Sequence, residues 1–152
     1  MVFLIASGNL NGQDLSFTIK LNKEYTKGEP VSCTMILKNT GSKDLTVNNR
    51  FLVNRPSGPH EVSFQVTNQN MNLIPFSAKI NASRDSKEFI VLHPGQTDSA
   101  TCNLSELFEI TETGVYYVEA YYENQFDPPG SLKMPSSWKG SLKSSKIIFT
   151  LR

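Results

Sequence analysis

Hydrophobic and polar residues alternate along most of this chain, in short runs that turn residues separate. The clearest run covers residues 15–21, in which every second side chain is apolar. Alternation with a period of two predicts a β-strand that has one buried face and one face in water. No segment keeps an apolar period of 3.6 over ten or more residues. The pattern therefore favours a protein built from strands rather than from long helices.

Further runs of this kind predict seven to nine strands in total. They cover residues 31–37, 45–47, 51–53, 61–66, 87–92, 98–104, 114–122 and 145–151. Residues 45–47 and 51–53 form either a pair of strands or one bulged strand. The turns between them are rich in Asn, Gly and Pro, which suit tight changes of direction. The length of 152 residues is that of one domain, so we expect a single domain over 1–152 with its core in 15–151.

The segment 103–122 predicts one particular corner of a β-sandwich. Residues 104–110 can form a short helical turn, which Asn103 is placed to cap. Gly114-Val115-Tyr116 follows and opens a long β-branched and aromatic strand. A helical turn, then Gly-x-Tyr, then a strand is typical of the crossover in an immunoglobulin-like sandwich, where a tyrosine hydroxyl bonds back to the backbone. Gly114 and Tyr116 are the expected structural corner.

The order of these turn motifs resembles that of prokaryotic immunoglobulin-like β-sandwich modules, over about 15–151. It is carried by Lys38-Asn39-Thr40-Gly41-Ser42, Leu92-His93-Pro94-Gly95-Gln96, Asn103-Leu104-Ser105 and Gly114-Val115-Tyr116. Similar patterns occur in small intracellular proteinase inhibitors of Bacillus type, in the accessory β-domains of some secreted zinc proteases and in macroglobulin-type domains. The resemblance implies an all-β fold, an immunoglobulin-like antiparallel β-sandwich. No reactive-site motif of an inhibitor matches here, so no inhibitory residue is carried over.

Net charge and hydropathy argue against some classes of binding partner. The net charge of +1 gives no reason to expect a nucleic acid or an anionic membrane. No apolar run approaches the roughly 18 residues that span a bilayer. We therefore expect a protein partner or a neighbouring domain, and a monomer rather than an oligomer. Residues 1–7 are apolar but lack the basic start of a signal peptide. A complete chain would begin in the cytoplasm, and a chain trimmed of a leader would be extracellular.

The sequence offers little for catalysis or for metal binding. His60 and His93 stand beside prolines in turn-like segments, and no nucleophile motif accompanies them. We expect two solvated turn histidines, no catalytic residue and no enzyme. Four aspartates are scattered singly rather than at ligand spacing, and no glycine-rich phosphate loop occurs. These are Asp14, Asp44, Asp85 and Asp98. We therefore expect no metal site and no cofactor.

The two cysteines, Cys33 and Cys102, are too few for a disulfide framework. Cys33 shares the apolar face of its strand with Val31 and Met35, which predicts a buried thiol. A bridge between the two cysteines is also possible if their strands are neighbours. It would differ from the inter-sheet bridge of antibody domains. That bridge has a cysteine two residues beyond the corner tyrosine, where this chain has Val118.

Charge is unevenly distributed in the second half of the chain. Every charged residue in 98–127 is acidic, and every one in 133–152 is basic. This is consistent with a bipolar surface that steers a charged partner. We favour the other interpretation, in which the two stretches belong to paired strands and their charges face one another across the ladder.

The segment 123–140 joins the last two strands and is far longer than an ordinary hairpin loop of about 2–5 residues. It holds Phe126, Leu132, Met134 and Trp138 among prolines and glycines. Large apolar side chains in a long loop indicate an interface core, and Phe126, Met134 and Trp138 are the candidate protein-binding residues. The alternative is that they fold back and close the core. The sequence thus predicts a non-enzymatic protein-binding or accessory module, with a proteinase inhibitor acting through its end loops as the alternative.

Overall fold

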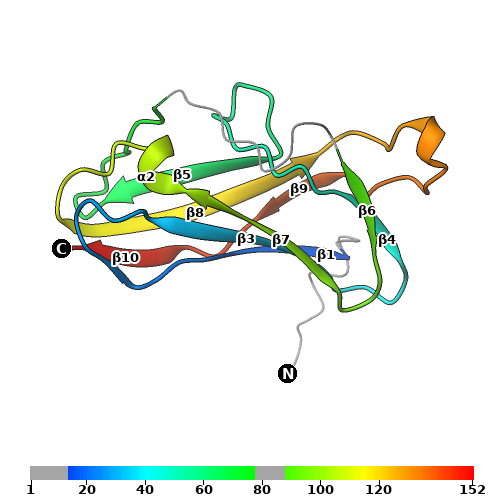
Figure 1. The fold of residues 1–152 in the computed structure, drawn as a ribbon, viewed down its shortest axis with the longest axis horizontal. Coiled ribbons are helices and arrows are strands. Elements are labelled where there is room, and N and C mark those ends of the chain that lie inside the picture. The colour runs from blue at the N-terminus through cyan, green and yellow to red at the C-terminus, as the bar shows by residue number, and fades with distance from the viewer. Residues whose placement is uncertain (1–13, 78–87) are drawn as a thin grey trace.

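Two sheets face each other across an apolar core in the computed structural model, which describes residues 14–77 and 88–152 (Figure 1). The first sheet has the strand order β1-β3-β7, and all its pairs are antiparallel. Its strands are β1 (Leu15–Lys20), β3 (Ser32–Asn39) and β7 (Thr97–Asn103). The fold class expected from the sequence, an antiparallel all-β sandwich, is confirmed.

The second sheet has the order β2-β10-β8-β5, and β9 also pairs with β8. Its strands are β2 (Glu24–Tyr25), β5 (Val62–Asn68), β8 (Gly114–Asn124), β9 (Gly140–Lys143) and β10 (Ile147–Leu151). Among the described strand pairs of this sheet, that between β2 and β10 alone is parallel. Strands β9 and β10 lie one after the other along β8, so they are two pieces of one interrupted strand. This interruption and the two-residue β2 bring the described strands to ten, against the seven to nine expected.

A third, two-stranded sheet of β4 (Leu45–Asn48) and β6 (Phe89–Leu92) lies at one end of the sandwich (Figure 1). The expected strand over 51–53 is wrong, because only Val53 makes a bridge, to Val62. Phe51 has a φ of 52°, a left-handed conformation that cannot continue a strand.

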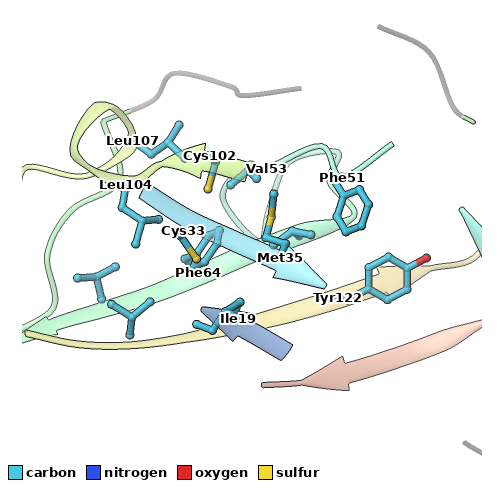
Figure 2. Close-up of a cluster of buried hydrophobic side chains, with 14 of the residues drawn as sticks. Ile19, Cys33, Met35, Phe51, Val53, Phe64, Cys102, Leu104, Leu107 and Tyr122 are labelled. Atoms are coloured by element: carbon cyan, nitrogen blue, oxygen red, sulfur yellow. The ribbon is translucent and has the colours of Figure 1, made fainter. Parts of the chain in front are cut away.

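The core follows from the alternation of side chains along the strands. In β8 the even-numbered side chains of 116–122 are buried, and in β1 those of Leu15, Phe17 and Ile19 are buried. Aromatic rings contribute much of this core: Tyr116 stacks on Phe149 with ring centroids 5.2 Å apart. Figure 2 shows how side chains from both sheets and from the short helix meet there.

The helical turn is α2 (Leu104–Leu107), and it is shorter than the expected 104–110. Asn103 caps it, since its Oδ1 accepts a hydrogen bond from the Ser105 N–H at 3.0 Å. The turn ends where Phe108 becomes extended and forms a bridge to Phe76. No helix within 14–77 and 88–152 is long and apolar enough to cross a membrane. Residues 1–7 and Asp85, on which sequence expectations were placed, lie outside the described residues.

The corner before β8 has the geometry that the sequence predicted. Tyr116 is buried, and its hydroxyl donates a hydrogen bond to the Glu112 carbonyl at 2.6 Å. Burial raises the pKa of this hydroxyl. Gly114 has a φ of 143°, and a Cβ there would lie 3.0 Å from Gln69 Oε1. Glycine therefore allows both the backbone conformation and the close approach.

The two cysteines lie directly opposite each other on the neighbouring strands β3 and β7, and both are buried free thiols. A hydrogen bond between them raises the pKa of Cys33, and burial raises it further. Both side chains are part of the core in Figure 2. The raised pKa leaves little reactive thiolate at Cys33, and burial keeps both sulfur atoms away from solvent.

The acidic and basic stretches meet across the hairpin that β8 and β9 form. Lys143 Nζ lies 3.3 Å from Glu119 Oε2, and Lys139 Nζ lies 2.6 Å from Asp127 Oδ1. At these two pairs the charges are matched within the chain, as we favoured from the sequence. The hydrogen bond from Lys139 lowers the pKa of Asp127, and the hydrogen bond to Glu119 raises the pKa of Lys143.

The corner hydrogen bond gives a first prediction. Replacing Tyr116→Phe should lower the free energy of unfolding by about 1 kcal/mol, because one hydrogen bond is lost from a ring that stays in place. Urea denaturation measures this difference. The control is Tyr117→Phe, the next residue on β8, whose side chain points to the opposite face of the sheet. Equal stability of both variants and the wild type would contradict the assigned corner.

The cysteine pair gives a second prediction. A thiol reagent should label two cysteines in denaturant without reductant and label the folded protein only slowly, because both thiols are buried. Ellman titration of the folded and denatured protein measures both values. A count of zero in denaturant would mean that Cys33 and Cys102 are bridged, and it would point to an oxidising compartment.

Candidate functional site

The long connection between β8 and β9, residues 125–139, lies at the end of the sandwich where β4 and β6 also lie (Figure 1, orange). It contains the short 3₁₀ helix η1 (Gly130–Leu132). Its two ends meet at the pair Asn124 and Gly140, the last rung of the β8–β9 ladder. The segment is therefore a closed loop on a rigid base.

The buried side-chain amide of Asn124 holds both ends of this loop. Its Nδ2 donates to the carbonyl oxygens of Phe126 at 2.9 Å and of Trp138 at 2.8 Å. The same nitrogen contacts Ser137 Oγ at 3.0 Å, and Ser137 Oγ in turn donates to the Phe126 carbonyl. Asn124 Oδ1 accepts a bond from Asn48 Nδ2 at 3.0 Å, which connects the loop to the end of β4. The side-chain amide of Asn124 thus holds both ends of the loop together and connects the loop to β4.

Trp138 is half-buried and packs against the core. Its backbone N–H donates to the Thr46 carbonyl at 2.8 Å, and its ring centroid lies 6.0 Å from that of Tyr122. A Cβ at Gly140, whose φ is 143°, would lie 3.0 Å from Trp138 Cη2. The indole therefore packs over a position that only glycine leaves open. Of the two interpretations of this residue, the core-closing one describes its contacts.

Phe126 and Leu132 lie on the outer side of the same loop. Phe126 is 49% exposed and Leu132 is 51% exposed, while Met134 is half-buried. The three residues predicted from the sequence to bind a protein therefore differ in exposure, because Phe126 is exposed while Met134 and Trp138 are half-buried. Leu132 was not in the predicted set. A loop without a regular period gives no signal for which apolar residues face outward.

A buried ion pair lies beneath this end of the sandwich. Arg50 holds Glu61 with two hydrogen bonds, from Nε to Oε1 and from Nη2 to Oε2, each 2.6 Å long. Glu61 Oε1 also accepts from the Leu52 N–H at 3.2 Å. The strained residue Phe51 lies between these two anchoring points. A left-handed non-glycine residue costs on the order of 1–3 kcal/mol, so the surrounding bonds must hold it in place.

The residues around this ion pair also contact Tyr122, near the C-terminal end of β8. The Tyr122 hydroxyl donates to the Asn48 carbonyl at 2.7 Å, and Asn48 Oδ1 accepts from the Arg50 N–H at 3.2 Å. Burial raises the pKa of Tyr122 strongly, and the nearby Glu61 carboxylate raises it further. The phenol therefore stays neutral and acts as a fixed hydrogen-bond donor.

His60 does not match its sequence expectation. Its side chain is only 9% exposed, so the prediction of two solvated turn histidines is wrong for this residue. Its Nδ1 lies 2.8 Å from the Gly58 carbonyl, and it donates there because a carbonyl can only accept. Its Nε2 is buried and has no hydrogen-bond partner in the described structure. Glu123 Oε2 lies 3.5 Å from this nitrogen.

His93 does match the expectation. Its side chain is 61% exposed, and its Nδ1 lies 2.7 Å from Asp44 Oδ1. The two histidines therefore differ in their surroundings. His93 is exposed and bonds directly to the Asp44 carboxylate, whereas the Nε2 of His60 is buried and has no hydrogen-bond partner.

His60 lines a pocket of about 250 Å³, together with Gln125 and Phe126 of the long loop. The charged and aromatic residues of its wall are Arg50, His60, Glu61, Glu123 and Phe126. Within residues 14–77 and 88–152, no three His, Cys, Asp or Glu side chains cluster in a way that could hold a metal ion. The pocket wall thus combines the His60 ring, the Glu123 carboxylate 3.5 Å from its Nε2, and the exposed ring of Phe126.

No family model matches the chain, and no curated protein matches it. Among solved structures, the chain is similar to a β-glucosidase from Listeria innocua, at 15% identity and a TM-score of 0.38. The alignment covers 90% of this chain and 16% of the β-glucosidase chain. The same enzyme in complex with gluconolactone gives 12% identity and a TM-score of 0.37. A likeness at these TM-scores carries no argument about fold or function.

The amide of Asn124 gives a third prediction. Asn124→Ala should lower the free energy of unfolding by about 1–3 kcal/mol, because buried groups of the loop and of Asn48 lose their partner. The loop 125–139 should also become a site of rapid proteolysis. Urea denaturation and limited proteolysis measure the two effects. The matched control is Gln125→Ala, an exposed neighbour that should change neither. Wild-type stability of Asn124→Ala would show that the loop does not depend on this amide.

Proposed function

We propose that this chain is a non-enzymatic protein-binding module, which binds its partner through the end of the sandwich that carries residues 125–139. The observation that supports this best is the exposure of Phe126 and Leu132 on a loop that buried Asn124 holds from beneath. Apolar side chains held in place before binding lose little entropy in the complex. Aromatic residues are also enriched in the cores of protein interfaces.

The side chains capable of chemistry support a binding role rather than a catalytic one. Cys33 and Cys102 are buried in the core, where a raised pKa keeps Cys33 protonated. The Nδ1 of His60 is engaged by a backbone carbonyl, and His93 is paired with Asp44 on the surface. None of these arrangements places a nucleophile beside a base.

A proteinase inhibitor that acts through its end loops is the narrower form of this proposal. The resemblance to intracellular proteinase inhibitors motivates it, and the closure of the loop at Asn124 is the kind of preorganisation that such a loop needs. The competing role is an accessory module without a separate ligand. The inward packing of Trp138 is consistent with that role, and the exposure of Phe126 and Leu132 favours binding.

The fourth prediction separates these roles. The double variant Phe126→Ala/Leu132→Ala should bind the partner more weakly by about 2 kcal/mol or more, with hardly any change in melting temperature. Trp138→Ala should instead lower the melting temperature by several degrees, because a ring that packs on the core is removed. The partner is first captured from the source lysate with the wild-type chain, and binding of each purified variant is then measured by calorimetry.

The control for this experiment is Ile148→Ala on β10. Ile148 is an exposed apolar residue like Phe126 and Leu132, but it lies on the outer face of the second sheet. It should leave binding unchanged. If Ile148→Ala abolishes binding and the double variant does not, the sheet face is the interface and the proposal for the loop is wrong. Inhibition assays on a panel of proteinases test the narrower form.

A further inference from the structure

The outer face of the second sheet carries a row of residues that crosses its strands and has an exposed aliphatic side chain at each end. We propose that two copies of this chain associate through this face, related by a two-fold axis that runs along the strands between β8 and β5. This interface is separate from the loop 125–139 and goes beyond the proposed function.

The row follows from the register of the sheet, in which β10, β8 and β5 lie side by side (Figure 1). Ile148 on β10 lies opposite Tyr117 on β8, and Tyr117 lies opposite Thr67 on β5. Thr67 also forms a bridge to Leu73. Residues directly opposite each other in a ladder point to the same face. That face is the outer one, because Tyr116, the neighbour of Tyr117, is buried in the core.

The two ends of the row are strongly exposed. Leu73 is 66% exposed and Ile148 is 54% exposed. Met71, which is 60% exposed, lies beside the row and lines a hollow of about 30 Å³ with Thr67 and Tyr117. The outer face of a sandwich sheet ordinarily carries polar side chains. A contiguous group of exposed apolar side chains there indicates a surface that another protein covers.

The turn that presents Met71 is ordered before any association. Asn68 Oδ1 accepts hydrogen bonds from the N–H groups of Asn70 at 2.9 Å and of Asn72 at 3.0 Å. The Asn68 N–H also donates to the Asn72 carbonyl at 3.0 Å. Because these bonds fix the turn, little conformational entropy is lost when its side chains are covered.

The proposed axis brings matching residues together. It keeps each residue at its height along the strands and reverses the order of the strands. Leu73 of one copy then faces Ile148 of the other, and Tyr117 faces Thr67. Each aliphatic end of the row meets the aliphatic end of the other copy, and each tyrosine ring covers a threonine. The row is thus complementary to itself, which is the requirement for an interface between two identical subunits.

The polar border of the row fits the same axis. In the next row Glu119 on β8 lies opposite Gln65 on β5. The axis therefore places the Gln65 amide of one copy, which can donate a hydrogen bond, against the Glu119 carboxylate of the other. Glu119 is paired with Lys143 at 3.3 Å, and Lys146 lines the same hollow, so the border carries both signs of charge. With a net charge of only +1, two copies do not repel each other strongly.

A dimer differs from the monomer that we expected from the sequence. The register that aligns Ile148, Tyr117, Thr67 and Leu73 joins residues from distant parts of the chain, and it is not visible in the sequence. The row spans only four neighbouring chain segments, so the interface is small. We expect weak association, with a dissociation constant on the order of 10–100 μM.

The experiment is sedimentation equilibrium of the full chain from about 5 μM to about 1 mM, which brackets this dissociation constant. The mass should rise with concentration from that of a monomer toward that of a dimer. Leu73→Glu or Ile148→Lys should each weaken association about tenfold or more, because each places a charge against an aliphatic side chain. Melting temperatures should hardly move, since both positions are exposed.

The double variant Leu73→Glu/Ile148→Lys tests the axis itself. In the proposed dimer the new glutamate of one copy faces the new lysine of the other, twice, so the double variant should regain association that both single variants lose. The matched control is Val91→Glu on β6, a charge introduced at another exposed apolar residue away from this face. It should leave association unchanged.

A monomer at every concentration overturns the inference. So does a dimer that persists in both single variants, which would place the contact on another surface. Failure of the double variant to associate overturns it as well, because Leu73 and Ile148 would then not face each other. None of these outcomes bears on partner binding through residues 125–139, which the variants Phe126→Ala/Leu132→Ala test separately.

Discussion

The alternation of side chains along β8 is the constraint on which the rest of this structure depends. Even-numbered residues face the core from Tyr116 to Tyr122, and the same period places Asn124 on the core face at the end of the strand. A buried amide must find hydrogen-bond partners, and those within reach belong to the long loop and to β4. The conformation of the loop therefore follows from the periodicity of a strand. Tyr116 at the corner and Asn124 at the loop are thus the first and the last buried residues of the alternation along β8.

Features that depend on local patterns were predictable from the sequence. The strands followed from alternation, and the corner followed from Gly114-Val115-Tyr116, since each signal lies within a few residues. The burial of His60 could not be predicted, because groups that lie beside it in the fold, such as Glu123, are distant in the sequence. The opposite orientations of Phe126 and Trp138 had no signal either, since the loop lacks a period. The burial of Asn124 did have a sequence signal, because Asn124 occupies the next even-numbered position after the alternating residues 116–122.

The buried charges and the strained backbone at this end of the sandwich belong together. A buried ion pair such as that of Arg50 and Glu61 adds little net stability, because desolvation of the charges offsets their attraction. The ion pair instead fixes the local backbone conformation. It fixes the positions on either side of Phe51, whose φ of 52° would otherwise relax. The polar groups of this region thus fix the shape of this end of the sandwich, while the apolar core supplies the stability.

The interruption between β9 and β10 changes which residues of the last strand face the core. Leu142 in β9 faces inward at an even-numbered position, whereas Phe149 and Leu151 in β10 face inward at odd-numbered positions. Ser144 at the break bonds to Ala120 through both its N–H and its Oγ, which keeps the strand attached while the phase shifts by one residue. Without this shift of one residue, Phe149 and Leu151 would point toward water while Leu142 faces the core.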